Sequence, residues 1–185
     1  GGTVTSSGHA AETMVLFPLM APGMEVIVSN KLYGGTINLM GKSFRKFGWN
    51  AVFVDNDNPE AFRAAVTEKT RAIFVESLAN PGGVIVDLEA IAKIAQEAEV
   101  PLIVDNTMAT PWFCRPFEWG ADLVVHSTTK FLSGQGNAMG GIVIDSGRFP
   151  WFGNAKYPSL SEPCPDYNGL TFAETFGDMA FTLYS

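Results

Sequence analysis

Short runs of apolar, mostly β-branched residues recur along the chain, and longer, more polar segments separate them. A short run that is apolar at nearly every position is typical of a strand buried on both faces. The pattern predicts strands over residues 25–29 (EVIVS), 51–55 (AVFVD), 72–77 (AIFVES), 101–106 (PLIVDN), 122–127 (DLVVHS) and 141–145 (GIVID).

Segments with helical periodicity fill the intervals between these runs. In DLEAIAKIAQEAE, for example, the apolar positions share one face of a helix. Asn58 before Pro59 is a typical helix start, and Gly48 is typical of a helix end. The alternation of strands and helices predicts an α/β fold with a mostly parallel sheet sandwiched by helices. The predicted helices cover residues 8–20, 35–48, 58–70 and 87–99.

The two ends of the chain lack this alternation. The first residues, GGTVTSSG, are typical of a glycine-rich turn. After Arg148 the pattern gives way to Pro, Gly and aromatic residues, which predicts a long loop over a site or an interface. Because the chain starts without Met and stops at FTLYS, inside an amphipathic segment, we expect it to be part of a longer polypeptide.

Composition and charge limit the class of protein. The chain has 185 residues, of which 46% are hydrophobic, enough for one domain with a core. The net charge of −7, with no basic block, argues against nucleic-acid and anionic-membrane partners. The run MVLFPLMAPGMEVIV is broken by prolines and a glutamate, so it does not predict a membrane span. Cys114 and Cys164 form no metal-ligand pattern and indicate free thiols in a reducing compartment, which predicts a cytoplasmic location.

Polar residues follow several of the predicted strands and mark a helix start. In open α/β sheets, ligands bind beyond the carboxyl ends of the strands, so these side chains are expected on one rim. Each of them has a structural interpretation by itself, as a cap, a turn residue or a solvated lysine. The candidates are Gly8, His9, Tyr33, Asn80, Asp105, Ser127, Thr129 and Lys130.

Other motifs give no competing site. The stretch GQGNAMG has the wrong spacing for a dinucleotide-binding fingerprint, and no P-loop, HExxH or GxSxG occurs. The side chains of His9 and His126 are as compatible with structural roles as with a site.

The candidate set matches the needs of pyridoxal 5'-phosphate. This cofactor needs an amine to form an imine and a carboxylate to keep its pyridine nitrogen protonated. Its phosphate binds best to hydroxyls and a helix N-terminus. A flat aromatic ring and a polar partner for the phenolic oxygen complete the requirements.

Several stretches resemble the pyridoxal-phosphate-dependent transsulfuration (Cys/Met metabolism, cystathionine γ-synthase-like) family. They are SSGHAAE, LYGGT, ESLANP and VDNTMATPWFCRPFEWGADLVVHSTTKFLSGQGNAMGGIVID, and they occur in the family's order over essentially the whole chain. The later stretch YPSLSEPCPDYNGLTF is most similar to the O-acetylhomoserine sulfhydrylase subgroup. The resemblance implies that residues 1–185 form the large cofactor-binding domain of a fold-type-I, aspartate-aminotransferase-like enzyme.

The resemblance also implies roles for residues around the cofactor ring. Lys130 would be the Schiff-base lysine and the base that removes the substrate α-proton. Asp105 would pair with the pyridinium nitrogen. Tyr33 would stack on the ring and assist departure of the leaving group. Asn80 would meet the phenolic oxygen, with Glu76 nearby in support.

For the phosphate, the resemblance implies contacts from the backbone amides of Gly8 and His9 and from the hydroxyls of Ser127 and Thr129. The chain departs from the family at one place, residues 134–136, which read Gly-Gln-Gly where Gly-His-Gly is frequent. An arginine for the substrate carboxylate, and a Tyr and an Arg from a neighbouring subunit, are expected outside this chain.

The implied activity is γ-replacement on O-acetyl-L-homoserine with sulfide, which gives L-homocysteine and acetate in methionine biosynthesis. A γ-lyase or a cystathionine γ-synthase has the same cofactor site and stays an alternative, as does a non-catalytic nucleotide-binding α/β module. A structural fragment in which the polar residues are only caps and turns is a third possibility. The family expectation for assembly is a homotetramer whose dimers share active sites.

Overall fold

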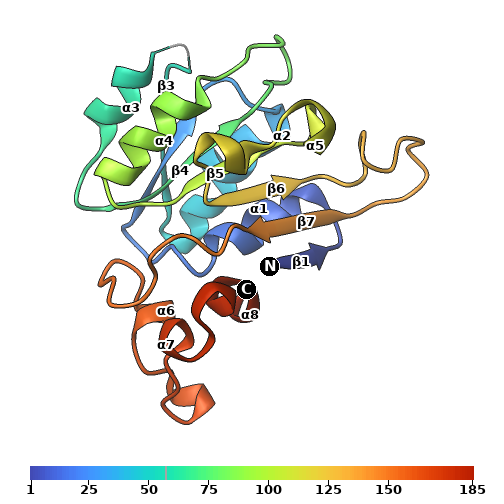
Figure 1. Ribbon diagram of the computed structural model, residues 1–185. Coiled ribbons are helices and arrows are strands. Elements are labelled where there is room, and N and C mark those ends of the chain that lie inside the picture. The colour runs from blue at the N-terminus through green and yellow to red at the C-terminus, as the bar shows by residue number, and fades with distance from the viewer. Residues whose placement is uncertain (57) are drawn as a thin grey trace.

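One seven-stranded sheet organises the computed structural model, which describes residues 1–56 and 58–185. The strand order is β1-β7-β6-β5-β4-β2-β3 (Figure 1). The strands from β6 to β3 pair in parallel, whereas β7 is antiparallel to β6 and β1 is antiparallel to β7. The strands are β1 (Gly2–Thr5), β2 (Glu25–Ser29), β3 (Asn50–Val54), β4 (Thr70–Glu76), β5 (Leu102–Asp105), β6 (Leu123–His126) and β7 (Gly141–Asp145).

Helices cover both faces of this sheet and create two hydrophobic cores. Side chains alternate along β2, so that Val26 and Val28 point into one core and Ile27 into the other. Helices α3 and α4 pack on one face, and α1 packs on the other with the C-terminal helices nearby (Figure 1). The helices are α1 (Gly8–Leu16), α2 (Gly34–Asn38), α3 (Pro59–Ala65), α4 (Leu88–Glu97), α5 (Thr110–Phe113), α6 (Pro158–Ser161), α7 (Phe172–Phe176) and α8 (Ala180–Tyr184).

The strand predictions are confirmed, with shifts of one or two residues at the ends. The helix caps are confirmed as well. The side chain of Asn58 accepts a hydrogen bond from Glu60 N at 3.1 Å, and Gly48 ends its helix with a left-handed φ of 76°. Among the described residues, none of the helices combines the length and the apolarity needed to cross a lipid bilayer.

Three helix predictions were too long or too regular. The helix predicted over residues 58–70 ends at Ala65. The helix predicted over residues 8–20 ends at Leu16, because Pro18 lacks the N–H that would continue it. The helix predicted over residues 35–48 is α2 followed by a π-helical turn, Leu39–Ser43, and a 3₁₀ turn, Phe44–Phe47. Met40 and Phe44 on these turns are buried in the hydrophobic core.

Predictions for the chain ends were wrong in part. The N-terminal residues expected in a turn contain β1, an edge strand that pairs with β7. The loop expected after Arg148 contains short helices that bury an aromatic cluster of Trp151, Tyr157 and Phe181. Trp151 stacks on Phe181 with ring centroids 5.4 Å apart and meets Tyr157 edge-on at 5.2 Å. Such short elements carry no detectable period, so only packing reveals them.

Removing the hydroxyl of Tyr157 should destabilise the fold measurably. The fully buried Tyr157 hydroxyl donates to Arg71 O at 2.9 Å and ties the C-terminal segment to β4. We expect Tyr157→Phe to cost about 1 kcal/mol, and Tyr157→Ala about 3–5 kcal/mol, in the free energy of unfolding measured with urea. Tyr167→Phe, at an exposed tyrosine, is the control and should have no effect. Equal stabilities for Tyr157→Phe and the unchanged protein would contradict this role.

Candidate active site

The predicted site residues surround one cavity of about 730 Å³. It lies at the edge of the sheet where β2, β4, β5 and β6 end, and the N-terminus of α1 completes its wall. The structure therefore brings the predicted amine, carboxylate, phenol and hydroxyls together, while the roles assigned to them stay predictions. The wall contains Gly8, His9, Tyr33, Asn80, Asp105, Ser127, Thr129 and Lys130.

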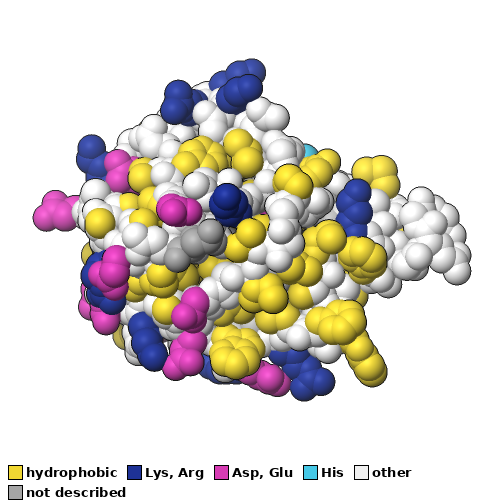
Figure 2. Space-filling model, turned by 90° about the horizontal axis from the view of Figure 1, so that it is seen from above, with side chains coloured by type: hydrophobic (Ala, Val, Ile, Leu, Met, Phe, Trp, Pro, Cys, Tyr) yellow, Lys and Arg dark blue, Asp and Glu magenta, His cyan; other side chains and the backbone are white. Residues whose placement is uncertain are grey.

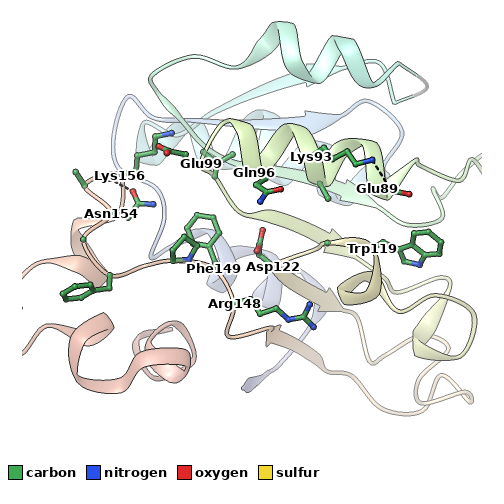
Figure 3. A pocket seen from close by; sticks show the side chains of 17 residues that line it. Glu89, Lys93, Gln96, Glu99, Trp119, Asp122, Arg148, Phe149, Asn154 and Lys156 are labelled. Carbon is green, nitrogen blue, oxygen red and sulfur yellow. Dashed lines mark hydrogen bonds and ion pairs between the residues drawn. The ribbon is translucent and has the colours of Figure 1, made fainter.

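A larger cavity, of about 910 Å³, lies between α4 and residues 148–156 (Figure 3). It is at the opposite edge of the sheet, because Asp122 in its wall precedes β6. Asp122 Oδ2 accepts a hydrogen bond from Leu102 N at 2.9 Å, and burial raises the pKa of Asp122 to about 6. Lys93 pairs with Glu89 at 2.9 Å. These groups make structural contacts, and no predicted site residue lines this cavity.

Asp105 is the acid at the end of β5, and only 9% of it is exposed. Its Oδ1 accepts two hydrogen bonds from Thr107, from the backbone N at 2.9 Å and from Oγ1 at 2.5 Å. Burial raises the pKa of Asp105, and the two Thr107 donors oppose this rise because they stabilise the carboxylate. A buried carboxylate of this kind is stabilised further when a cation binds beside it.

Thr107 connects this acid to the next strand. Its Oγ1 donates to Asp105 and accepts a hydrogen bond from Ser127 N at 2.8 Å. One hydroxyl thus fixes Asp105 relative to the segment that carries Ser127 and Lys130. Thr107 was not among the predicted site residues, although a hydroxyl residue shortly after a strand-end Asp is a common turn pattern that signals such a contact.

The start of α1 forms a cradle that suits an anion. Ser7 caps the helix by accepting from Ala10 N at 3.1 Å, and Gly8 follows it. A Cβ on Gly8 would lie 2.7 Å from Ser127 Cβ, so only glycine allows this close approach. The N–H groups of a first helical turn point out of the helix and carry partial positive charge, which favours a phosphate beside Ser127.

Thr129 lines the cavity but its hydroxyl is already engaged. Thr129 Oγ1 donates to Gly140 O at 3.2 Å and accepts from Gly140 N at 3.0 Å. A hydroxyl has a single proton, so Thr129 would have to release Gly140 O before it could donate to a phosphate.

Lys130 follows β6 in a turn, where its backbone N donates to Ser127 O at 3.2 Å. Its side chain is exposed and lines the same cavity as Asp105. The amine and the acid required at the two ends of one heteroaromatic ring therefore face a shared space.

Glu76 holds two further members of the wall through their backbones. Its Oε1 accepts from Tyr33 N at 2.6 Å and its Oε2 accepts from Asn80 N at 2.9 Å. Burial raises the pKa of Glu76 to about 7, and the nearby charge of Asp105 adds to the rise. Tyr33 as a whole remains 46% exposed, so it is accessible to a ligand. Glu76 thus positions both the predicted stacking residue and the predicted partner of the phenolic oxygen.

The two histidines differ in their surroundings. His9 lines the cavity, whereas His126 is 1% exposed at the end of β6 and lies outside its wall. Burial lowers the pKa of His126 to about 4, which keeps this side chain neutral at physiological pH. The structure thus favours the structural interpretation of His126. Glu12, a buried acid in the wall, was also not among the predicted site residues.

Comparison with known proteins gives the chain a family context. The family described as Cys/Met metabolism PLP-dependent enzyme matches residues 1–162. The O-acetyl-L-homoserine sulfhydrylase of Leptospira meyeri is 48% identical over 173 residues, which cover 94% of this chain and 39% of that protein. The homocysteine/cysteine synthase of Saccharomyces cerevisiae is 41% identical over 181 residues, covering 97% of this chain and 41% of that protein. The chain thus spans about two fifths of these curated relatives.

Solved structures agree with this context. An O-acetylhomoserine (thiol)-lyase from Campylobacter jejuni superimposes with a TM-score of 0.94 and 37% identity, covering 98% of this chain and 45% of that one. That structure is described as containing N'-pyridoxyl-lysine-5'-monophosphate. The O-acetylhomoserine sulfhydrylase of Wolinella succinogenes, described as catalysing sulfur transfer in methionine biosynthesis, has a TM-score of 0.83 and 35% identity, with 98% and 48% coverage.

Substituting Gly8 should weaken binding of a phosphate-bearing ligand. In Gly8→Ala the new methyl group would push Ser127 away from the helix start, and we expect the dissociation constant of pyridoxal 5'-phosphate to rise by about tenfold or more. Absorbance titration of the full-length apoprotein measures this constant. Gly34→Ala is the control, because a Cβ there meets nothing within 4 Å. Unchanged affinity in Gly8→Ala would show that the cradle does not hold the phosphate.

Burial of His126 should make stability pH-dependent. Its pKa is about 6.5 when unfolded and about 4 when folded, so the unfolded state binds the proton first. Stability from this residue is complete above about pH 6.5 and is lost as the pH falls towards 4, by about 3 kcal/mol. Urea unfolding between pH 4 and 7 should show a shallower pH dependence for His126→Asn than for the unchanged protein. Parallel pH dependences of stability for the two proteins would show that burial does not lower the pKa of His126.

Proposed function

The chain belongs to the Cys/Met metabolism PLP-dependent enzyme family, and on this premise we propose that the full-length protein catalyses γ-replacement on O-acetyl-L-homoserine with sulfide. The products are L-homocysteine and acetate. One structural observation carries the proposal: Lys130 and Asp105 line the same cavity, beside a helix start that suits a phosphate. Relatives named as sulfhydrylases support the choice of reaction within the family.

The residues present fit pyridoxal 5'-phosphate at both ends. Asp105 uses Oδ1 for Thr107, which leaves Oδ2 for the pyridine nitrogen. The Gly8 cradle, which a Cβ would fill, would take the phosphate with Ser127. Bound there, the cofactor supplies an electron sink for the carbanion chemistry. The large domain over residues 1–185 would thus carry the cofactor, with substrate contacts from outside this chain.

The side chains of the cavity would then divide the proton transfers between them. Lys130 Nζ would hold the cofactor covalently and, once displaced by the substrate amine, accept the proton from the substrate Cα. Asp105 would keep a proton on the pyridine nitrogen by remaining ionised beside it. Tyr33 would lie on the ring and help the acetate leave. Because Asp105 is buried by its neighbours, little water would reach that end of the site.

The assembly that we propose is a homo-oligomer, a tetramer whose dimers share active sites. Large hydrophobic side chains are exposed on the protruding 131–140 loop, where Phe131 and Met139 line the cavity, and on α5, and Figure 2 shows hydrophobic side chains gathered next to that loop. Surfaces of this kind are typical of interfaces between subunits. The exposed residues are Trp112, Phe113, Phe131 and Met139.

A cytoplasmic location is supported by the free thiols Cys114 and Cys164.

A substrate assay on the purified full-length protein tests the reaction. With O-acetyl-L-homoserine, we expect homocysteine and acetate to appear only when sulfide is added. A γ-lyase would release 2-oxobutyrate and ammonia without sulfide, and a cystathionine γ-synthase would require cysteine. Either result would replace the proposed reaction while keeping the cofactor. A protein without visible absorbance would instead favour a nucleotide-binding or purely structural domain.

Substitution of Lys130 tests the assignment of the amine. Borohydride reduction should fix the cofactor to the peptide that contains Lys130, and Lys130→Ala should lower turnover by roughly 10³-fold or more. Lys93→Ala, at an exposed lysine on α4, is the matched control and should retain activity. Near-normal turnover of Lys130→Ala would refute its role.

A further inference from the structure

A buried acid, Glu12, lies in the cavity wall and has no role in the chemistry proposed above. Only 3% of the residue is exposed, and Oε1 accepts a hydrogen bond from Thr36 Oγ1 at 2.6 Å. Oε2 is buried too, yet among the described residues it has no hydrogen-bond partner. A buried carboxyl oxygen without a hydrogen-bond partner costs free energy. We therefore expect Oε2 to gain a partner when the site is in use.

Through Thr36, Glu12 holds the segment that carries Tyr33. Thr36 is fully buried on α2, one helical turn after Tyr33, and Ile37 N donates to Tyr33 O at 3.0 Å. Tyr33 N is fixed from the other side by Glu76 Oε1 at 2.6 Å. The backbone of the Tyr33 segment is therefore held between two buried carboxyl groups, one on α1 and one on β4.

Through His9, Glu12 also reaches the Tyr33 ring. His9 Nε2 lies 4.0 Å from Glu12 Oε2, at the i and i+3 positions of α1. The rings of His9 and Tyr33 have centroids 6.0 Å apart and planes at 33°. A Cβ on Gly35 would lie 2.6 Å from Tyr33 Cε1 and 2.7 Å from His9 Cε1, so glycine is what lets both rings sit over this position.

We propose that Glu12 is a positioning residue that orients Tyr33 over the cavity, through Thr36 on the backbone side and through its contact with His9 on the ring side. When Glu12 ionises, its proton passes to solvent, and the carboxylate Oε2 then attracts the N–H at His9 Nε2. The attraction draws His9 towards Glu12 and changes its packing against Tyr33. The consequence for turnover rests on the proposed function, whereas the orientation of Tyr33 does not.

The surroundings of Glu12 place its ionisation close to physiological pH. Burial raises the pKa of Glu12 to about 8, the Thr36 hydrogen bond opposes the rise, and the carboxylates of Asp105 and Glu76 add to it. His9 faces the acid from its own helix, and Lys130 lines the same cavity after β6. A proton held by Glu12 also removes a negative charge beside Asp105, which leaves Asp105 as the acid available to a cation.

Nuclear magnetic resonance of the full-length protein with ¹³C-labelled tyrosine tests the orientation without any cofactor. Tyr33 should show a chemical-shift change with pH, with its midpoint near 8, in the unchanged protein. Glu12→Gln keeps the shape and an acceptor for Thr36 but cannot ionise, so this titration should disappear, and His9→Gln should remove it too. Glu89→Gln, at an exposed ion-paired acid, is the control. An unaltered Tyr33 titration in Glu12→Gln would overturn the proposal.

Kinetics and cofactor binding then distinguish the positioning role of Glu12 from the proposed γ-replacement activity. In Glu12→Ala, kcat should fall by about tenfold with a smaller change in KM, and Glu12→Gln should restore most of kcat at neutral pH while flattening its pH profile. Loss of activity in Glu12→Ala that Glu12→Gln does not restore would overturn the positioning role. If the unchanged protein binds no pyridoxal 5'-phosphate, the proposed function fails, and the Tyr33 titration still decides the role of Glu12.

Discussion

The parallel register of β4, β5 and β6 is the constraint on which the cavity depends. Glu76 pairs directly with Asp105 at the ends of β4 and β5, and β6 places Ser127 and Lys130 one strand further along. Parallel strands end at the same edge, so residues far apart in sequence reach one rim at the strand ends or in the turns that follow them. The Thr107 hydroxyl then fixes the relative position of β5 and β6 through Asp105 and Ser127 N.

The pKa values of the acids in the cavity wall follow from their burial close together at this edge of the sheet. Glu12, Glu76 and Asp105 are all buried at one edge, and burial raises the pKa of each. Their hydrogen bonds distinguish them. Asp105 receives two donors on one oxygen, Glu76 receives backbone donors on both oxygens, and Glu12 receives a single donor and keeps one oxygen without a partner among the residues that the structure describes. The same wall therefore offers one acid suited to a cation and another suited to holding a proton.

The sequence predicted the strands and the starts of the longer helices because these depend on local patterns. Buried strands need apolar runs, and the caps at Asn58 and Gly48 follow from backbone chemistry that the residue types impose. It did not predict the antiparallel edge strand β1 or the C-terminal helices. Those elements are short, and long-range packing of Trp151 and Tyr157 stabilises them, which no local period records.

The sequence by itself determined which chemical groups stand at the strand ends: the Lys130 amine, the Asp105 carboxylate and the Tyr33 phenol. This is possible because the apolar runs that form strands, and the polar residues that follow them, can be read directly from the order of residues along the chain. Only the tertiary structure decided how these groups are held. The contacts of Thr107 and Glu12 join different elements, and whether an oxygen is buried, engaged or free depends on neighbours that the chain order does not specify.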